Sequence, residues 1–419
     1  MDVSTPPAPR AAAMRFIMIT VLIDMMSIGL IVPVLPALVG TFTESKPEQA
    51  LWTAVAAVAF GLANFFGSSL LGGLSDRYGR RPVLLIGFCG FALSFFATAL
   101  ASSLWMLVFV RALGGALQAN AAAANAYVAD ITAPQDRAKR FGLLGAMFGL
   151  GFTLGPALGG FLAQFDLHWP FWVAGGLSLI NLVYGIAVLP ESLPPERRRP
   201  VAWWRANPFT ALKALSNLRG VGWLVGVLAL SSLAQFILHS TWVLYTQFRF
   251  QWGPAENGWS LFTVGVVSAL VQGVLLRRLL KRWGAPQVAV IGLVSGSLAF
   301  LLWGLAIQGW MMYAVIGLNL LGFSAASALQ SIFSNAAEAQ NQGQTLGAVS
   351  SLNSLMLVVA PLIGGPVLTA VSDLPPSDWR LGAPFFLCAA LQAVAAVLAV
   401  RHFRKRATWA GGQPAWHRG

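Results

Sequence analysis

Two charged side chains lie deep inside long apolar stretches of this sequence, Asp24 within residues 16–38 and Arg111 within residues 104–129. Apolar surroundings disfavour an ionised carboxyl group, so Asp24 suits reversible protonation near neutral pH. We expect Asp24 to couple proton or cation movement; the alternative is a structural hydrogen bond or an ion pair, for example with Arg111. Arg111 itself needs a partner or a water-filled lining, unless its side chain reaches the end of its helix.

Other polar side chains are spread singly over the apolar stretches. His239 is either a second protonation site, because histidine titrates near neutral pH, or a neutral packed residue. Mostly apolar walls with a few amides suit a bulky amphipathic ligand, although each amide could instead form an interhelical hydrogen bond. The residues that we expect to line a substrate cavity are Gln118, Asn120, Gln235, His239, Tyr245, Asn319, Gln330 and Asn353.

These residues must be positioned by helices that cross a lipid bilayer. Of the 419 residues, 57% are hydrophobic and 10% are charged, whereas a soluble domain carries about 25% charged residues. A membrane helix needs about 20 apolar residues, and the sequence contains twelve such stretches. They are residues 16–38, 50–74, 82–102, 104–129, 140–164, 169–189, 221–246, 259–281, 285–307, 310–334, 344–371 and 381–401.

The basic residues predict the orientation of these spans. The net charge is +13, but the basic residues lie in short loops between apolar stretches, so we expect a bilayer and no nucleic acid as partner. All but four of the 27 Lys and Arg residues lie on one side of the predicted spans, the side that carries both termini. The exceptions are Lys46, Arg249 and Arg380 on the opposite side, and Arg111 inside a span. The excess predicts a multi-pass protein of the inner (plasma) membrane with both termini in the cytoplasm.

The sequence also repeats itself at an offset of 205 residues. Trp105-Met106 recurs as Trp310-Met311, and the Pro156 to Gly160 segment recurs as Pro361 to Gly365. The repeat predicts two pseudo-symmetric six-helix halves, residues 1–189 and 221–402, joined by a cytoplasmic linker, 190–220, and followed by a basic tail, 403–419. In such an arrangement the substrate site is expected where the halves meet, near the bilayer midplane.

A complete short motif follows the second span. Residues 72–82 read Gly-Gly-Leu-Ser-Asp-Arg-Tyr-Gly-Arg-Arg-Pro and resemble the signature loop of major facilitator transporters. The resemblance implies a cytoplasmic latch in the outward-facing state, with Gly72 at a close helix approach and Gly79 in a tight turn; the alternative is a basic loop that only sets topology. The motif residues are Gly72, Asp76, Arg77, Gly79, Arg80 and Arg81.

The fifth span carries a glycine-rich pattern around Pro156. It resembles the motif of exporters in the same superfamily, in which glycines permit close packing and the proline kinks the helix; generic helix packing is the alternative. The residues concerned are Gly145, Gly149, Gly155, Pro156, Gly159 and Gly160.

Most of residues 15–195, and more weakly 255–400, resemble the tetracycline efflux proteins, which are proton antiporters. The resemblance implies a role for Arg111 in controlling proton transfer. The chain departs from that family at three charged positions, where it has Ser94, Ser268 and Gly296. We therefore expect a monomeric transporter that exports drugs or other amphipathic molecules against the proton gradient, without a cofactor or metal. The alternative is an exporter or facilitator of a single native metabolite; no nucleophile–base pair, metal cluster or nucleotide loop indicates an enzyme.

Overall fold

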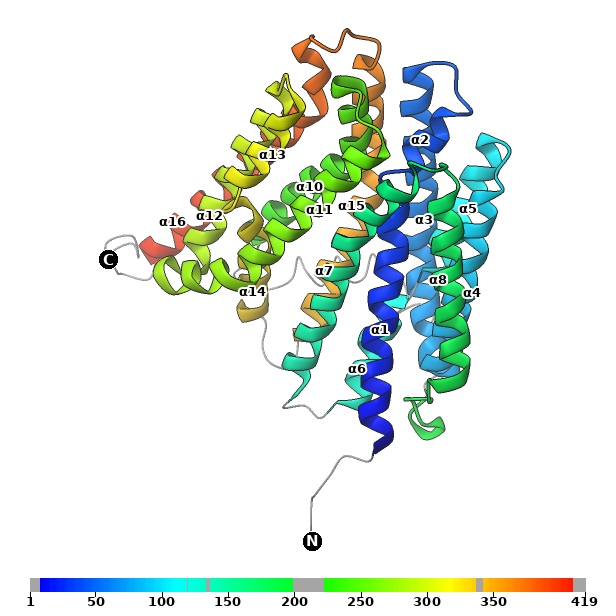
Figure 1. Ribbon diagram of the computed structural model, residues 1–419. Coiled ribbons are helices and arrows are strands. Elements are labelled where there is room, and N and C mark those ends of the chain that lie inside the picture. Colours follow the sequence, from blue (N-terminus) through cyan, green and yellow to red (C-terminus); the bar gives the residue numbers. More distant parts are fainter. Residues whose placement is uncertain (1–7, 119, 133–135, 199–221, 337–341, 410–419) are drawn as a thin grey trace. The chain divides into compact units, whose positions relative to one another are not determined.

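The computed structural model describes residues 8–118, 120–132, 136–198, 222–336 and 342–409 (Figure 1). Its regular elements in these ranges are helices, in agreement with the predicted class. The helices of the first half of the chain are α1 Ala8–Ile31, α2 Leu35–Gly40, α3 Lys46–Tyr78, α4 Arg80–Ala99, α5 Leu104–Leu117, α6 Asn120–Ile131, α7 Arg137–Leu162, α8 Trp169–Val188 and the short η2 Pro195–Arg197.

The second half continues with the same class of element. It comprises α10 Gly222–Phe250, α11 Pro254–Leu270, η3 Val271–Leu275, α12 Leu276–Leu305, α13 Gly309–Leu318, η4 Gly322–Ser324, α14 Ala325–Ala336, α15 Gln342–Val371, η5 Trp379–Gly382 and α16 Ala383–Trp409. Most of the predicted linker, residues 199–221, and the end of the tail, residues 410–419, lie outside the described residues.

The described helices account for the twelve predicted spans. Nine of them are long and apolar enough to cross a membrane, and the bent pair α13 and α14 adds a tenth. One of the nine, Pro254–Leu305, contains two predicted spans, which meet at Gly284, where φ is 75° and ψ is 163°. The span predicted at 104–129 is made of α5, which is shorter, and α6.

Three predicted spans are interrupted, which apolar length alone does not reveal. The first of them is divided between α1, which ends at Ile31, and α2, which begins at Leu35. α5 ends at Leu117, and Gln118 has φ −81° and ψ 74°. α13 ends at Leu318, and the chain bends by 57° before the next helical segment. The 205-residue repeat relates Gln118 to Phe323, which lies in η4, so both halves break the corresponding helix at nearly the same point. Both breaks expose backbone groups that a continuous helix would pair internally.

The chain forms two compact units. Unit 1 consists of residues 1–44, 55–208 and 252–265, and unit 2 consists of residues 45–54, 209–251 and 266–419. Each unit therefore contains one segment from the other half of the sequence: the start of α3 belongs to unit 2, and the first part of α11 belongs to unit 1.

Unit 1 is organised around the contact between α1 and α7, which lie side by side in Figure 1. Glycines on α7 allow the backbones to touch. A Cβ atom at Gly159 would lie 1.9 Å from the Leu30 carbonyl oxygen, and one at Gly155 would lie 2.6 Å from that of Met26. Any larger residue would push the helices apart. α1 also packs against α8, and α4 packs against α8 and α5.

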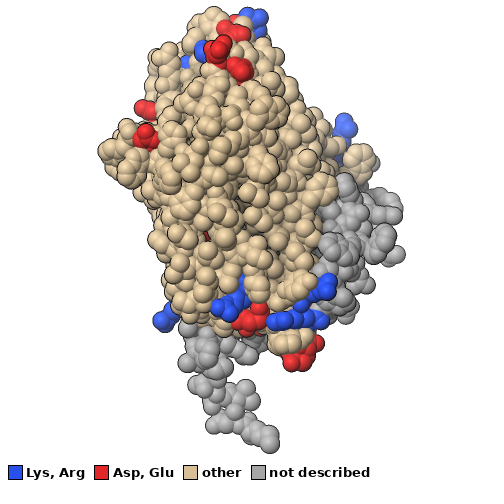
Figure 2. Space-filling model, turned by 90° about the vertical axis from the view of Figure 1, so that its right-hand side faces the viewer, with Lys and Arg blue, Asp and Glu red and all other residues tan. Residues whose placement is uncertain are grey.

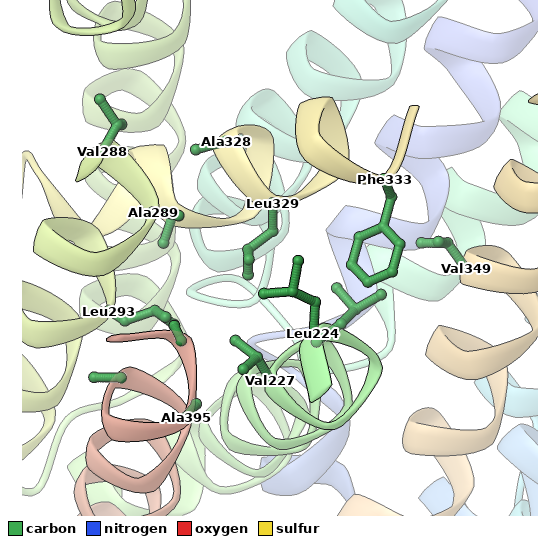
Figure 3. Packing of buried hydrophobic residues seen from close by; sticks show 14 of the residues in the cluster. Leu224, Val227, Val288, Ala289, Leu293, Ala328, Leu329, Phe333, Val349 and Ala395 are labelled. Atoms are coloured by element: carbon green, nitrogen blue, oxygen red, sulfur yellow. The ribbon is translucent and has the colours of Figure 1, made fainter. Parts of the chain in front are cut away.

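Unit 2 has an apolar core between α10, α12, α14, α15 and α16 (Figure 3). Phe333 of α14 is fully buried beside Leu224 of α10 and Val349 of α15.

On the face drawn in Figure 2, the charged side chains gather toward the two ends, and a broad band of uncharged residues separates them. This distribution is the one expected of a protein whose middle lies in hydrocarbon.

Candidate proton-coupling and substrate site

Asp24 lies on the face of α1 that packs against α8, with only 1% of its surface exposed. Its Oδ1 accepts a hydrogen bond of 3.1 Å from Nδ2 of Asn181, which also donates to the Thr20 carbonyl oxygen at 3.0 Å. Two further polar atoms of these residues are buried without a hydrogen-bond partner among the described residues, namely Thr20 Oγ1 and Asn181 Oδ1. The carboxylate is thus held in a small polar cluster enclosed by apolar helices, which is a suitable setting for binding and releasing a proton.

Arg111 lies on α5 and faces α3. Its guanidinium carbon is 4.3 Å from the centroid of the Phe60 ring, and its Nε is buried without a hydrogen-bond partner in the described structure. The negative face of an aromatic ring attracts a cation most strongly where water is excluded. Phe60 therefore stabilises the charge of Arg111 inside the membrane-spanning part of unit 1.

The predicted lining residues of unit 1 lie at the break between α5 and α6. Asn64 of α3 donates to the backbone oxygen of Gln118 at 3.2 Å and to its side-chain oxygen at 3.4 Å. Gln118 thereby makes the interhelical bond that was the alternative to ligand binding, and its side chain remains partly exposed. The side chain of Asn120 lies outside the described residues.

Three predicted lining residues of unit 2 are tied to neighbouring groups. Asn353 of α15 accepts a hydrogen bond of 2.8 Å from Ser232 of α10. Asn319, at the break after α13, accepts one of 3.2 Å from Ser295. Tyr245 is fully buried, packs its ring 4.3 Å from that of Phe385 and donates to the Trp303 carbonyl oxygen, so it belongs to the packed core of unit 2 and not to an exposed wall.

The other predicted residues of unit 2 keep accessible side chains. His239 is exposed, and its ring meets that of Phe236 edge to face at 6.2 Å. Gln235, one turn earlier on α10, is half-buried, and Gln330 of α14 is exposed. These three side chains are free to meet a ligand, whereas Asn319 and Tyr245 are buried.

The polar sequence of the signature motif suggested a loop, but most of the motif is helical. α3 continues to Tyr78 and α4 begins at Arg80, so Gly79 alone separates them, with φ 111°. Only glycine adopts this conformation readily, which explains the abrupt turn. A Cβ at Gly72 would meet no described atom within 4 Å.

The charges of the motif form a network within unit 1. Arg80 pairs with Asp76 at 2.6 Å and with Asp130 of α6 at 3.1 Å. The carboxylate of Glu191, which follows α8, accepts hydrogen bonds from the backbone nitrogens of Arg80 and Arg81 at 2.9 and 3.2 Å. A carboxylate at a helix N-terminus is stabilised by the unpaired N–H groups there. Arg81 also donates to the Ile186 carbonyl oxygen, and Arg77 lies over the neighbouring Tyr78 ring.

The glycines of α7 fall into two groups. Gly155 and Gly159 pack against α1, and Gly160 packs against Pro254 and Ala255 of α11. Cβ atoms at Gly145 and Gly149 would meet no described atom within 4 Å. Pro156 lies inside the continuous helix α7, and its carbonyl oxygen is 2.4 Å from the place a Gly258 Cβ would occupy.

The three positions that depart from the tetracycline efflux pattern hold neutral groups in defined surroundings. Ser94 donates to the Val110 carbonyl oxygen, and Ser268 accepts from Gln272. A Cβ at Gly296 would lie 3.0 Å from Nε2 of Gln392, a buried residue of α16.

Sequence reasoning singled out Asp24 and Arg111 but missed the groups that contact them, Asn181 and Phe60. A signal for Asn181 was available, because a lone asparagine in an apolar span requires a hydrogen-bond partner. No such signal existed for Phe60, since the chain contains 27 phenylalanines.

Comparison with known proteins agrees with this architecture. A family model described as Major Facilitator Superfamily matches residues 17–361 and 229–418. Tetracycline resistance protein, class C, from Escherichia coli is 34% identical over 382 residues, which cover 91% of this chain and 95% of that protein. Major facilitator superfamily domain-containing protein 10 from Bos taurus is 28% identical, covering 92% of this chain and 91% of its own.

Solved structures show the same fold. The human organic anion transporter MFSD10 has a TM-score of 0.69 and 24% identity, covering 94% of this chain and all of its own. A mutant of the nucleoside transporter NupG has a TM-score of 0.74 and 14% identity, covering 93% of this chain and all of its own. The predicted fold and the resemblance to tetracycline efflux proteins are thus confirmed, and the chain belongs to the major facilitator superfamily of secondary transporters.

Proposed function

We propose that this transporter exports drugs or other amphipathic small molecules in exchange for protons. The observation that carries the proposal is the carboxylate of Asp24, which is enclosed within unit 1 and hydrogen-bonded to Asn181. An acid inside a membrane is costly, and its usual use is in a proton or ion pathway. The relatives named tetracycline resistance proteins support export as the direction of transport.

Arg111 supports the same proposal, because it keeps a positive charge inside the membrane-spanning part of unit 1, over the Phe60 ring. His239 and Gln235 in unit 2 offer accessible polar groups, with apolar residues between them on α10, as an amphipathic ligand requires.

Proton flux in inside-out vesicles tests the proposal. The vesicles are energised to an acid interior, tetracycline with magnesium is added, and the interior pH is read with a quenched dye. Export coupled to protons raises the interior pH in the wild type, and Asp24→Asn abolishes the rise. Glu196→Gln, which removes an exposed carboxylate outside the spans, serves as the control and leaves the response unchanged.

The neutral groups at Ser94 and Gly296 favour a second candidate, the export or facilitated diffusion of a single native metabolite. A magnesium–tetracycline chelate is met best by acids, and at these positions the chain offers a serine bonded to a backbone carbonyl and a glycine beside Gln392. No response to tetracycline, followed by an Asp24-dependent response to one compound in a panel of organic anions and cations, would select this candidate.

A further inference from the structure

We infer that Asn181 is a positioning residue for Asp24, whose amide sets the pH at which this carboxyl group takes up and releases its proton. The inference rests on the proposed proton coupling, and it adds a second residue to that site. Asp24 lies on α1 and Asn181 lies on α8. These two helices belong to the same unit and pack against each other.

The orientation of the Asn181 amide is determined by its two acceptors. Nδ2 donates to Asp24 Oδ1 at 3.1 Å and to the Thr20 carbonyl oxygen at 3.0 Å. Turning the amide over would place Oδ1 against both of these oxygens, which an ionised Asp24 does not tolerate. Both amide hydrogens are therefore committed to one turn of α1, and they fix the position of the carboxylate along it.

This donation favours the ionised form of Asp24. A hydrogen bond to an ionised acceptor is stronger than one to a neutral acceptor, and more so where water is excluded. Asn181 has no exposed surface, and Asp24 has 1%. Without the amide, the carboxylate would lose the donor that lies 3.1 Å from its Oδ1.

The same amide also suits the protonated form. Asn181 Oδ1 is buried and has no hydrogen-bond partner among the described residues. Once Asp24 carries a proton, a half turn of the amide presents this oxygen to the new O–H group, at the expense of the bond to Thr20. Asparagine thus matches both states of the acid, whereas an aliphatic residue matches neither.

The other titratable groups near this turn are few. The helices packed most extensively against α1 carry Arg137, Lys139 and Arg140 on α7, Tyr127 and Asp130 on α6, and Tyr184 on α8. The basic residues of α7 lie in its first turn, whereas the part of α7 level with Asp24 is Gly151, next to Leu22, Met25 and Met26. Tyr127 donates to the Pro190 carbonyl oxygen, Asp130 pairs with Arg80, and Tyr184 packs on Phe16, so each is engaged elsewhere.

Infrared difference spectroscopy of the purified full-length protein in lipid nanodiscs tests the inference without any substrate. The carboxylic acid C=O band of Asp24 is assigned by its loss in Asp24→Asn and followed as a function of pH. In Asn181→Leu, which has a similar volume and no donor, we expect the band to persist to a pH about one unit higher or more. Its frequency also rises, because a hydrogen bond to the group is lost.

Ser178→Ala is the matched control. Ser178 lies one turn before Asn181 on the same face of α8, is equally buried and has no hydrogen-bond partner among the described residues. The variant Ser178→Ala should leave both the pH midpoint and the frequency of the Asp24 band unchanged. If Asn181→Leu does not fold, Asn181→Ser, whose side chain is too short to reach Asp24, replaces it with the same expectation.

A wild-type midpoint and frequency in a folded Asn181 variant overturn the inference, as does an equal shift in Ser178→Ala. Proton flux in vesicles is measured in parallel and reports on the proposed function alone. A shifted Asp24 band together with absent flux in the wild type would retain the role of Asn181 and remove the proton coupling.

Discussion

Arg111 keeps its charge in the membrane-spanning part of unit 1 through an aromatic ring, which is an unusual partner compared with a carboxylate. The 4.3 Å separation from the Phe60 ring lies within the range in which a cation and a ring attract each other. Such a contact holds the guanidinium in place.

We predict that Phe60 and Arg111 are energetically coupled. A double-mutant cycle with Phe60→Leu and Arg111→Met should give a coupling free energy of about 1–2 kcal/mol, because the contact is shielded from water. The measurement is thermal unfolding of the purified protein, followed by tryptophan fluorescence in detergent. Phe60→Tyr keeps the ring and should retain the stability of the wild type; strictly additive effects of Phe60→Leu and Arg111→Met would contradict the coupling.

At the residue scale, the sequence predicts which side chains need partners but not which partners they find. Asp24 and Arg111 stand out because each is a charge in an apolar stretch. Their contacts, Asn181 and Phe60, depend on which faces of α8 and α3 turn toward them, and helix rotation leaves no trace in an apolar run. The same uncertainty explains why Tyr245 was expected to line a cavity. An aromatic ring with a hydroxyl group suits a cavity wall as well as it suits the core in which Tyr245 is buried.

At the scale of the elements, the glycines of α7 belong to one motif but have different surroundings along the helix. Its glycines recur every few residues, yet only some of them face α1, since the helix presents different sides along its length. Gly159 lies against the backbone of Leu30, whereas Gly145 meets no described atom within 4 Å.

We predict that alanine distinguishes these two positions. Gly159→Ala should lower the free energy of unfolding by about 1–3 kcal/mol, because its methyl group cannot be placed without moving α1 away from α7. Gly145→Ala should change it by less than about 0.5 kcal/mol. Thermal unfolding of both variants under identical conditions checks the difference, and similar losses of stability would show that the α1–α7 contact does not limit the stability of unit 1.

The helices themselves could be predicted from the sequence more completely than their interruptions. Apolar length identifies a span because the hydrocarbon thickness sets a minimum number of residues. It does not report backbone angles, so the breaks at Gln118 and after Leu318 were not foreseen. The continuation of α3 to Tyr78 was missed for the opposite reason: Ser75 to Tyr78 are polar or exposed but remain helical because the helix leaves the apolar layer.

For the molecule as a whole, the distribution of basic residues predicts the orientation in the membrane. We expect green fluorescent protein fused after Gly419 to fluoresce, because the basic residues predict a cytoplasmic C-terminus. Alkaline phosphatase fused after Glu44, in the connection between α2 and α3, should be active, because the predicted orientation places that connection on the opposite side. A phosphatase fusion after Pro194, following α8, is the control and should be inactive; activity there with none after Glu44 would reverse the orientation.

The exchange of segments between the two halves has a consequence for the synthesis of the protein. Unit 1 requires residues 252–265, but residues 209–251 belong to unit 2 and leave the ribosome first. The first six predicted spans therefore enter the bilayer while Gly160 of α7 still lacks its contact with Pro254 and Ala255. The last segment of unit 1 is thus synthesised only after residues 209–251 of unit 2, so unit 1 cannot be complete before part of unit 2 is present in the bilayer.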